Sequence, residues 1–230
     1  MTEQRRYALI GPNFFAYIQA IRQNLEQRGI PSAFFDERHA NSIPVKILYR
    51  LGYYHRFQGR KRQHLDGIAQ QVIEGGYTDA YLIDVEVCDP PFVQRLVDAG
   101  VRVHLYMWDS ARNKPSYLKY LHLLHGKGSF DPEDCEAHGL AYIPLFAEDV
   151  FSAKVQGLPA DHARTVDLSF CGTLHSDRAV HVAALQDFAQ TRGLKTGLML
   201  YFHSRWLLLV KGLVHLSNAR FVRTIATKGY

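Results

Sequence analysis

Short apolar runs alternate with amphipathic stretches along the first two-thirds of the chain. Runs such as 7–10 and 80–83 are almost wholly apolar, which is typical of strands buried on both faces of a sheet. Between such runs, apolar residues recur three and four positions apart, as in 14–28, and this spacing predicts helices. The expected strands are 7–10, 33–35, 80–83, 101–107, 128–130 and 142–145, and the expected helices are 14–28, 43–51, 60–74, 92–99, 118–124 and 132–138. Strands that alternate with helices predict a parallel, doubly wound α/β sheet with right-handed crossovers.

This alternation is interrupted at 148–164, a stretch with weak periodicity, and then begins again. The second part is expected to contain a strand at 167–171, a glycine turn at 172–173, a helix at 179–191 and a strand at 195–201. We therefore place a domain boundary near residue 155. The fold class expected is α/β, with a Rossmann-like domain at 1–154 and a second, incomplete Rossmann-like domain at 155–230.

Composition and cysteine usage narrow the class of protein. A chain of 230 residues with 47% hydrophobic and 21% charged residues is typical of a globular protein with a real core. The three cysteines lie far apart and form no CxxC pair, which argues against a disulfide scaffold or a structural zinc site. The start enters a strand without a signal region, and no apolar stretch is long enough to span a bilayer. We expect a soluble, cytoplasmic protein.

The charge is distributed unevenly. The net charge is +5, and no acidic residue follows Asp187, whereas seven lysines and arginines do. A second basic run, 50–62, is interleaved with tyrosine and phenylalanine. Such asymmetry suggests a phosphate-rich partner, although a solvated basic face would give the same pattern. The stretch 43–62 could dock as a basic amphipathic helix on an anionic membrane, or consist of a core helix followed by a solvated loop.

Polar residues follow several of the expected strands, where ligands bind in open parallel sheets. The candidates for substrate binding are Gly11, Asn13, Asp36, Glu37, Trp108 and Ser110, with Glu86 and Asp109 as candidate bases. Residues 11–14 carry only one glycine where a dinucleotide-binding fold has GxGxxG, which argues against NAD or FAD. The phosphate-binding motif GxxxxGK[ST] does not occur, which excludes a P-loop ATPase. The twelve histidines show no metal-ligand spacing. We therefore expect neither a dinucleotide cofactor nor a metal.

Two segments carry the densest candidate chemistry. At the expected strand end 107–113, Asp109 could orient a sugar hydroxyl while the Trp108 ring stacks on the sugar; a helix cap beside a packed tryptophan is the alternative. In 170–178, a glycine turn before a helix would present free N–H groups to an anion. Arg178 could add a bidentate phosphate contact there. The alternative for 170–178 is a plain helix cap with a solvated arginine.

Six segments, taken in order, resemble one known family. They are 9–15 (LIGPNFF), 35–38 (FDER), 106–110 (YMWDS), 130–134 (FDPED), 144–146 (PLF) and 170–178 (FCGTLHSDR). This ordered set looks like bacterial lipopolysaccharide and capsule biosynthesis glycosyltransferases, which are related to the spore-maturation-type glycosyltransferases. The resemblance runs from about residue 5 to residue 225 and implies a two-Rossmann-domain (GT-B) architecture.

The resemblance implies a metal-independent transfer from a nucleotide diphosphate sugar to a saccharide or lipid-linked saccharide acceptor. It places the acceptor on the first domain and the donor on the second, with the two strand-end segments facing one cleft. The donor's diphosphate would be bound by Gly172, Thr173, His175, Ser176 and Arg178, and the catalytic residues would be Asp109, Glu86 and His175. Relatives continue beyond the point where this chain ends, with a glutamate-bearing segment that binds the donor ribose.

Two alternatives from other classes remain at this stage. A truncated, non-catalytic module could bind only glycan or membrane. A nucleic-acid binder would explain the basic and aromatic residues, but the chain has no RNP, KH or helix-turn-helix signature, so we expect no nucleic-acid partner. The expected location is the cytoplasm, with peripheral association at the inner face of the cell membrane.

Overall fold

A computed structural model defines the fold. It describes residues 5–13, 17–38, 58–147, 153, 156–159, 165–173, 178–201 and 225–226. The chain divides into two compact units, Met1–Ser152 and Ala153–Tyr230. The helix expected at 43–51 and most of the connection at 148–164 lie outside the described residues, as does segment 174–177.

Unit 1 contains a six-stranded, wholly parallel sheet. Its strands are β1 (Tyr7–Gly11), β2 (Ser32–Asp36), β3 (Asp79–Ile83), β4 (Arg102–Met107), β5 (Gly126–Ser129) and β6 (Ala141–Tyr142). The order across the sheet is β2-β1-β3-β4-β5-β6, and each neighbouring pair is parallel. β2 is added on one side of β1, and β3 to β6 are added in turn on the other side. The strand order therefore reverses between β1 and β3, which is the switch point of the sheet.

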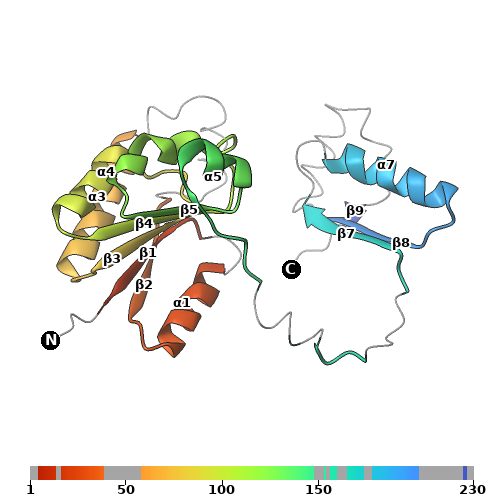
Figure 1. Ribbon diagram of the computed structural model, residues 1–230, viewed down its shortest axis with the longest axis horizontal. Helices are drawn as coiled ribbons and strands as arrows, with labels where there is room; N and C mark the ends of the chain where they lie inside the picture. The colour runs from red at the N-terminus through yellow and green to blue at the C-terminus, as the bar shows by residue number, and fades with distance from the viewer. Residues whose placement is uncertain are drawn as a thin grey trace. The chain divides into compact units, whose positions relative to one another are not determined.

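Helices cover both faces of this sheet, as Figure 1 shows. The helical elements are α1 (Tyr17–Gln27), α3 (Gln58–Glu74), α4 (Pro90–Asp98), the 3₁₀ helix η2 (Pro115–Leu123) and α5 (Pro132–His138). Helix α1 lies on one side, and α3, α4 and α5 lie on the other. The α/β, doubly wound class expected from the sequence is confirmed.

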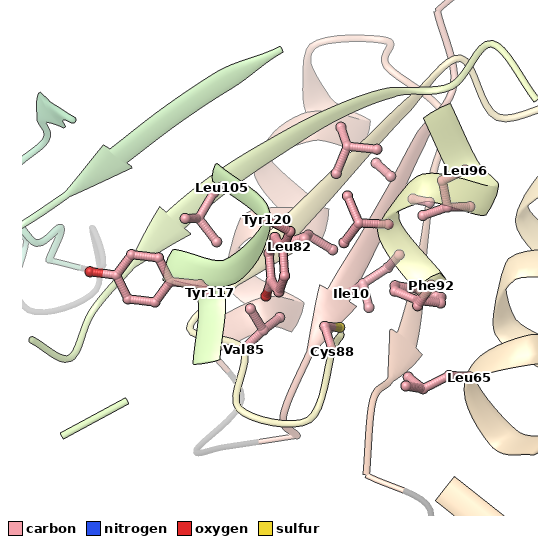
Figure 2. Packing of buried hydrophobic residues seen from close by; sticks show 14 of the residues in the cluster. Ile10, Leu65, Leu82, Val85, Cys88, Phe92, Leu96, Leu105, Tyr117 and Tyr120 are labelled. Atoms are coloured by element: carbon pink, nitrogen blue, oxygen red, sulfur yellow. The ribbon is translucent and has the colours of Figure 1, made fainter. Parts of the chain in front are cut away.

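The main core lies between the sheet and α3 and α4. Figure 2 shows Ile10 and Leu82 of the strands packed with Leu65 of α3 and with Phe92 and Leu96 of α4. Each of these side chains is 0–4% exposed, so each contributes about 1.5–3 kcal/mol through burial. A smaller cluster on the opposite face joins the sheet to α1, and it ties the start of that helix to the carboxyl ends of the strands.

Three local expectations need correction. The helix expected at 118–124 is the 3₁₀ helix η2, with non-helical backbone at Tyr120. The strand expected at 142–145 pairs only at Ala141–Tyr142, and Pro144 has no N–H to extend the ladder. The turn expected at Gly172–Thr173 is instead the end of a strand.

Unit 2 is a smaller parallel α/β unit. It consists of β7 (Leu168–Thr173), α7 (Arg178–Thr191), β8 (Thr196–Tyr201) and β9 (Ile225–Ala226), in the sheet order β7-β8-β9. Its core is formed by Ala179 and Val182 of α7 against Leu200 of β8. The helix and both longer strands lie where the periodicity predicted them.

The segment proposed for membrane docking, 43–62, is described only from residue 58 onward. There it forms the first turn of α3, where Arg60 and Arg62 are exposed and the Lys61 Nζ lies 3.6 Å from the Asp89 carboxylate. None of the helices in the described ranges combines the length and the apolar character needed to cross a membrane.

Candidate functional site

The reversal between β1 and β3 fixes where a ligand site is expected in unit 1. In open parallel sheets the loops diverge at such a switch point and leave a crevice at the carboxyl ends of the strands. Gly11 ends β1 there, in close contact with β3, because a Cβ on Gly11 would overlap the carbonyl oxygen of Ile83. Gly11 is buried and its neighbour Asn13 is exposed, so only Asn13 offers a side chain to a ligand.

Glu37 secures the loop that follows β3. Its side chain is completely buried, and its carboxylate accepts N–H bonds from Glu86 (2.7 Å), Val87 (2.8 Å) and Cys88 (3.0 Å). Burial raises the pKa of Glu37, and the three backbone donors oppose that shift. In this structure Glu37 therefore positions the loop and has no exposed atom to offer a substrate.

Asp84, directly after β3, has strained backbone geometry. Its φ of 49° makes it the one non-glycine residue with positive φ in the described part of the chain. The conformation is fixed by side-chain bonds, because the carboxylate accepts the Trp108 N–H at 3.2 Å and lies 2.5 Å from the Lys114 Nζ. These contacts join the end of β3 to the loop after β4.

Lys114 connects two carboxylates of the crevice. Besides Asp84, its ammonium group lies 3.1 Å from the Asp109 Oδ2, and its side chain is largely buried. Burial lowers the pKa of Lys114, but the two carboxylates outweigh burial and the net shift is upward. Burial raises the pKa of Asp84, while Lys114 opposes it. The ammonium group is therefore held charged beside Asp109. Sequence reasoning missed Lys114, since no motif marks it.

Trp108 is packed inside an aromatic cluster made by Tyr17, Tyr106, Trp108 and Phe146. The ring centroids of Tyr17, Tyr106 and Phe146 lie 5.6–5.9 Å from that of Trp108, each edge to face. The indole Nε1 is buried and makes no hydrogen bond. Trp108 is half-buried, whereas Tyr17 and Phe146 are exposed, so whether Trp108 itself stacks on a sugar stays a prediction.

The remaining predicted residues of unit 1 lie around the same edge. The Asp36 carboxylate accepts the Arg38 N–H at 2.9 Å, and the Arg38 guanidinium lies 3.3 Å from the exposed Glu86 carboxylate. Ser110 contributes its carbonyl oxygen, which accepts the N–H groups of Asn113 and Lys114 and so closes the turn that places Lys114. Hydrogen bonds and ion pairs thus link Asp36 and Glu86 through Arg38, and link Asp109 to Asp84 through Lys114.

In unit 2, the described part of the predicted donor segment is the end of β7 and the first residue of α7. The Arg178 Nη1 donates to the Thr173 carbonyl oxygen at 3.0 Å, and its guanidinium lies 5.9 Å from the centroid of the Phe170 ring. Gly172 lacks the Cβ that would otherwise contact this guanidinium. The predicted residues His175 and Ser176 lie outside the described residues. That Asp109 and Arg178 face one cleft stays a prediction.

The opposite, amino edge of the unit 1 sheet holds a different polar cluster. Asp79 is buried and bonds to Arg102 (2.7 Å), Thr78 (2.8 Å) and His104 (3.0 Å). Burial alone would raise the pKa of Asp79, but these bonds outweigh it and lower the pKa. A cavity of about 500 Å³, lined in part by Thr78 and Arg102, opens at this edge. It lies at the far end of the strands from the switch point, so it is separate from the candidate site.

The arrangement at the switch point suits a neutral, hydroxylated ligand. Glu86 and Asp109 offer exposed carboxylate oxygens for hydroxyl groups, and the cations that contact these carboxylates in the described part of the chain are Arg38 and Lys114. Across the described ranges, no group of three or more His, Cys, Asp or Glu side chains is placed to hold a metal ion.

The fold and this edge define a two-unit, Rossmann-like α/β protein of the GT-B-like class. The chain is similar to the crystal structure of UDP-GlcNAc 2-epimerase from Methanocaldococcus jannaschii in complex with UDP-GlcNAc and UDP. The TM-score is 0.53 at 11% identity, covering 97% of this chain and 73% of that chain. A second structure of the M. jannaschii enzyme gives a TM-score of 0.51 at 11% identity, covering 98% and 74%. At this identity the likeness shows the fold alone. No protein-family model matches the chain, and no curated protein matches it.

Proposed function

We propose that the chain is a sugar-nucleotide-dependent glycosyltransferase that acts on a saccharide acceptor of a surface polysaccharide such as lipopolysaccharide or capsule. The observation that carries the proposal is the fold, since 97% of the chain aligns with a protein that was solved with UDP-GlcNAc and UDP. The ordered motifs of the sequence support the same class. The acceptor assignment rests on the family resemblance.

On the donor side, the diphosphate lies at the end of β7 and the start of α7. The N-terminus of a helix attracts anions, and Arg178 occupies the first position of α7. The guanidinium has five N–H donors, and the bonds to Thr173 use only Nη1, so others remain for phosphate oxygens. With Gly172, Thr173, His175 and Ser176, this group stabilises the leaving diphosphate without a metal.

On the acceptor side, Glu86 or Asp109 takes the proton of the attacking hydroxyl. The Lys114 ammonium group lies 3.1 Å from the Asp109 Oδ2, so one of the two carboxylate oxygens of Asp109 is already engaged. Glu86 has only an exposed ion pair with Arg38, and such pairs contribute little, about 0–1 kcal/mol. Glu86 is therefore the stronger candidate for the general base, and Asp109 is suited to orienting the acceptor hydroxyls.

A UDP titration by calorimetry tests the donor assignment. Arg178→Ala should weaken UDP binding by about 1.5–3 kcal/mol, the range for hydrogen bonds to a charged group. Arg192→Ala is the matched control, because Arg192 lies at the other end of α7, stacked on Phe188. If both variants bind UDP as the unchanged chain does, the donor site is not at the start of α7.

A second candidate is a nucleotide-sugar epimerase, favoured by the fold similarity to UDP-GlcNAc 2-epimerase. An epimerase needs no acceptor and would convert UDP-GlcNAc into its C2 epimer. Proton NMR of the chain with UDP-GlcNAc alone separates the two functions. A new anomeric signal with an intact nucleotide link supports the epimerase, and release of UDP that depends on added acceptor supports the transferase.

A further inference from the structure

Two exposed aromatic rings contact Trp108, the residue that precedes Asp109 in the chain. Tyr17 is 37% exposed and Phe146 is 42% exposed, and their ring centroids lie 6.1 Å apart, edge to face. Both rings contact Trp108 in the aromatic cluster defined above. The residues come from three distant segments, namely the start of α1, the end of β4 and the stretch after β6. Such a cluster is built by the fold, because its members are far apart in the sequence.

The position of these rings matters because Asp109 adjoins Trp108 in the chain. The Asp109 side chain is 47% exposed, and one of its carboxylate oxygens contacts Lys114. An apolar ring surface beside an accessible carboxylate is complementary to a pyranose, which has an apolar C–H face and hydroxyl groups at its edge. Tyr17 and Phe146 offer the first kind of contact, and Asp109 offers the second.

Charge disfavours a nucleotide in the same place. Within the described ranges, the cations that contact the crevice carboxylates are Lys114 and Arg38, and each is already paired. A diphosphate placed here would meet the negative charges of the Asp84, Glu86 and Asp109 carboxylates. The edge therefore suits the uncharged ring of a sugar better than a nucleotide.

We infer that Tyr17 and Phe146 form the stacking surface for a pyranose ring of the acceptor, and that Asp109 binds its hydroxyl groups. This inference rests on the proposed glycosyltransferase function and deepens it by naming the acceptor subsite. Trp108, the residue that the sequence suggested for stacking, packs edge to face against both of these rings. The subsite selects a sugar with an apolar C–H face, such as a glucose- or N-acetylglucosamine-configured ring.

Saturation-transfer NMR with cellobiose and chitobiose as probes tests this subsite in the full chain. Both disaccharides consist of sugars with an apolar C–H face. We expect saturation of their axial C–H protons, and Tyr17→Ala or Phe146→Ala should weaken binding by about three- to tenfold. Tyr142→Ala is the control, because Tyr142 is 59% exposed but makes no ring contact in this cluster. Circular dichroism confirms that each variant is folded.

Three outcomes of these titrations would overturn the inference or separate it from the proposed function. Failure of both disaccharides to bind, or equal binding by the three variants, overturns the inference. The inference is also overturned if uridine gives a saturation-transfer signal where the disaccharides give none, and if Tyr17→Ala and Phe146→Ala abolish that signal. The two rings would then bind a nucleobase. A parallel titration with UDP keeps the proposals apart, because UDP binding without disaccharide binding refutes the subsite alone, and absence of UDP binding refutes the proposed function.

Discussion

Replacing Glu37 tests the part of the site that the structure defines most sharply. This carboxylate sits under the loop after β3 and accepts three consecutive backbone N–H groups, those of Glu86, Val87 and Cys88. Glu37→Ala removes the two carboxylate oxygens that accept these three bonds. Because the loop carries Asp84 and Glu86 into the crevice, its loosening should disturb the site as well as the fold.

The expected magnitude follows from the burial of the three amides. Cys88 is buried, so its N–H would be left unpaired, whereas Glu86 is exposed and Val87 half-buried, and their N–H groups can bind water. One buried unpaired N–H costs about 1–3 kcal/mol, and the vacated side-chain volume adds a cavity term, for a total of about 2–4 kcal/mol. Glu37→Gln keeps one acceptor oxygen and should cost about half as much.

Urea unfolding measures this loss. The chain has two tryptophans, so Trp206→Phe leaves Trp108 as the single source of tryptophan fluorescence. Trp108 reports on the loop because its backbone N–H donates to the carboxylate of Asp84, where the loop begins. A lower midpoint at unchanged m-value gives the change in stability. Amide hydrogen exchange should also accelerate at 86–88. The control is Glu86→Gln, which removes an exposed carboxylate of the same loop and should change stability by less than about 1 kcal/mol. Equal stability of Glu37→Ala and the unchanged chain would refute the reasoning.

Three further expectations concern the sheet and the membrane. The lowered pKa of Asp79 adds stability that is complete above its unfolded pKa, about 3.9, and is lost as pH falls through the lower folded pKa. Asp79→Asn should therefore cost about 1–3 kcal/mol at pH 7, and should flatten the fall of stability below pH 4 in acid titrations followed by circular dichroism. Gly11→Ala should destabilise unit 1 by about 1–3 kcal/mol in urea, because its Cβ would overlap a backbone oxygen of β3, and a neutral result would contradict the tight β1–β3 contact. Sedimentation with vesicles should show binding that rises with anionic lipid and drops when the cations of 56–62 become Gln; binding without lipid dependence would assign those cations to another partner.

The sequence predicted the sheet well because its strands are short, apolar and separated by amphipathic helices. Runs such as 7–10 and 80–83 have to be buried on both faces, and a parallel sheet between helices is the arrangement that achieves this. The strand ends were therefore predictable, and so was the edge at which Glu86 and Asp109 gather. The strand predicted at 142–145 was too long, because Pro144 within it has no backbone N–H to pair with the neighbouring strand.

The details of the site depend on contacts between residues far apart in the chain, which periodicity cannot reveal. Lys114 reaches Asp84 across 30 residues, and Glu37 binds amides about 50 residues away. Lys114 reads as an ordinary loop lysine, and Glu37 reads as an exposed strand-end carboxylate. The contact between Tyr17 and Phe146 could not be predicted from periodicity either, because the fold brings these residues together from opposite ends of unit 1.

Backbone amide NMR of the full chain during a UDP titration tests the central claim most directly. We assign the nucleotide to unit 2, where Arg178 begins α7 after Gly172 and Thr173, and a neutral sugar to the crevice of unit 1. We expect UDP to shift the amide signals of Gly172, Thr173 and Arg178 and to leave those of Asp84 and Trp108 unchanged. No shift at any UDP concentration, or shifts confined to the ends of β3 and β4, would contradict it.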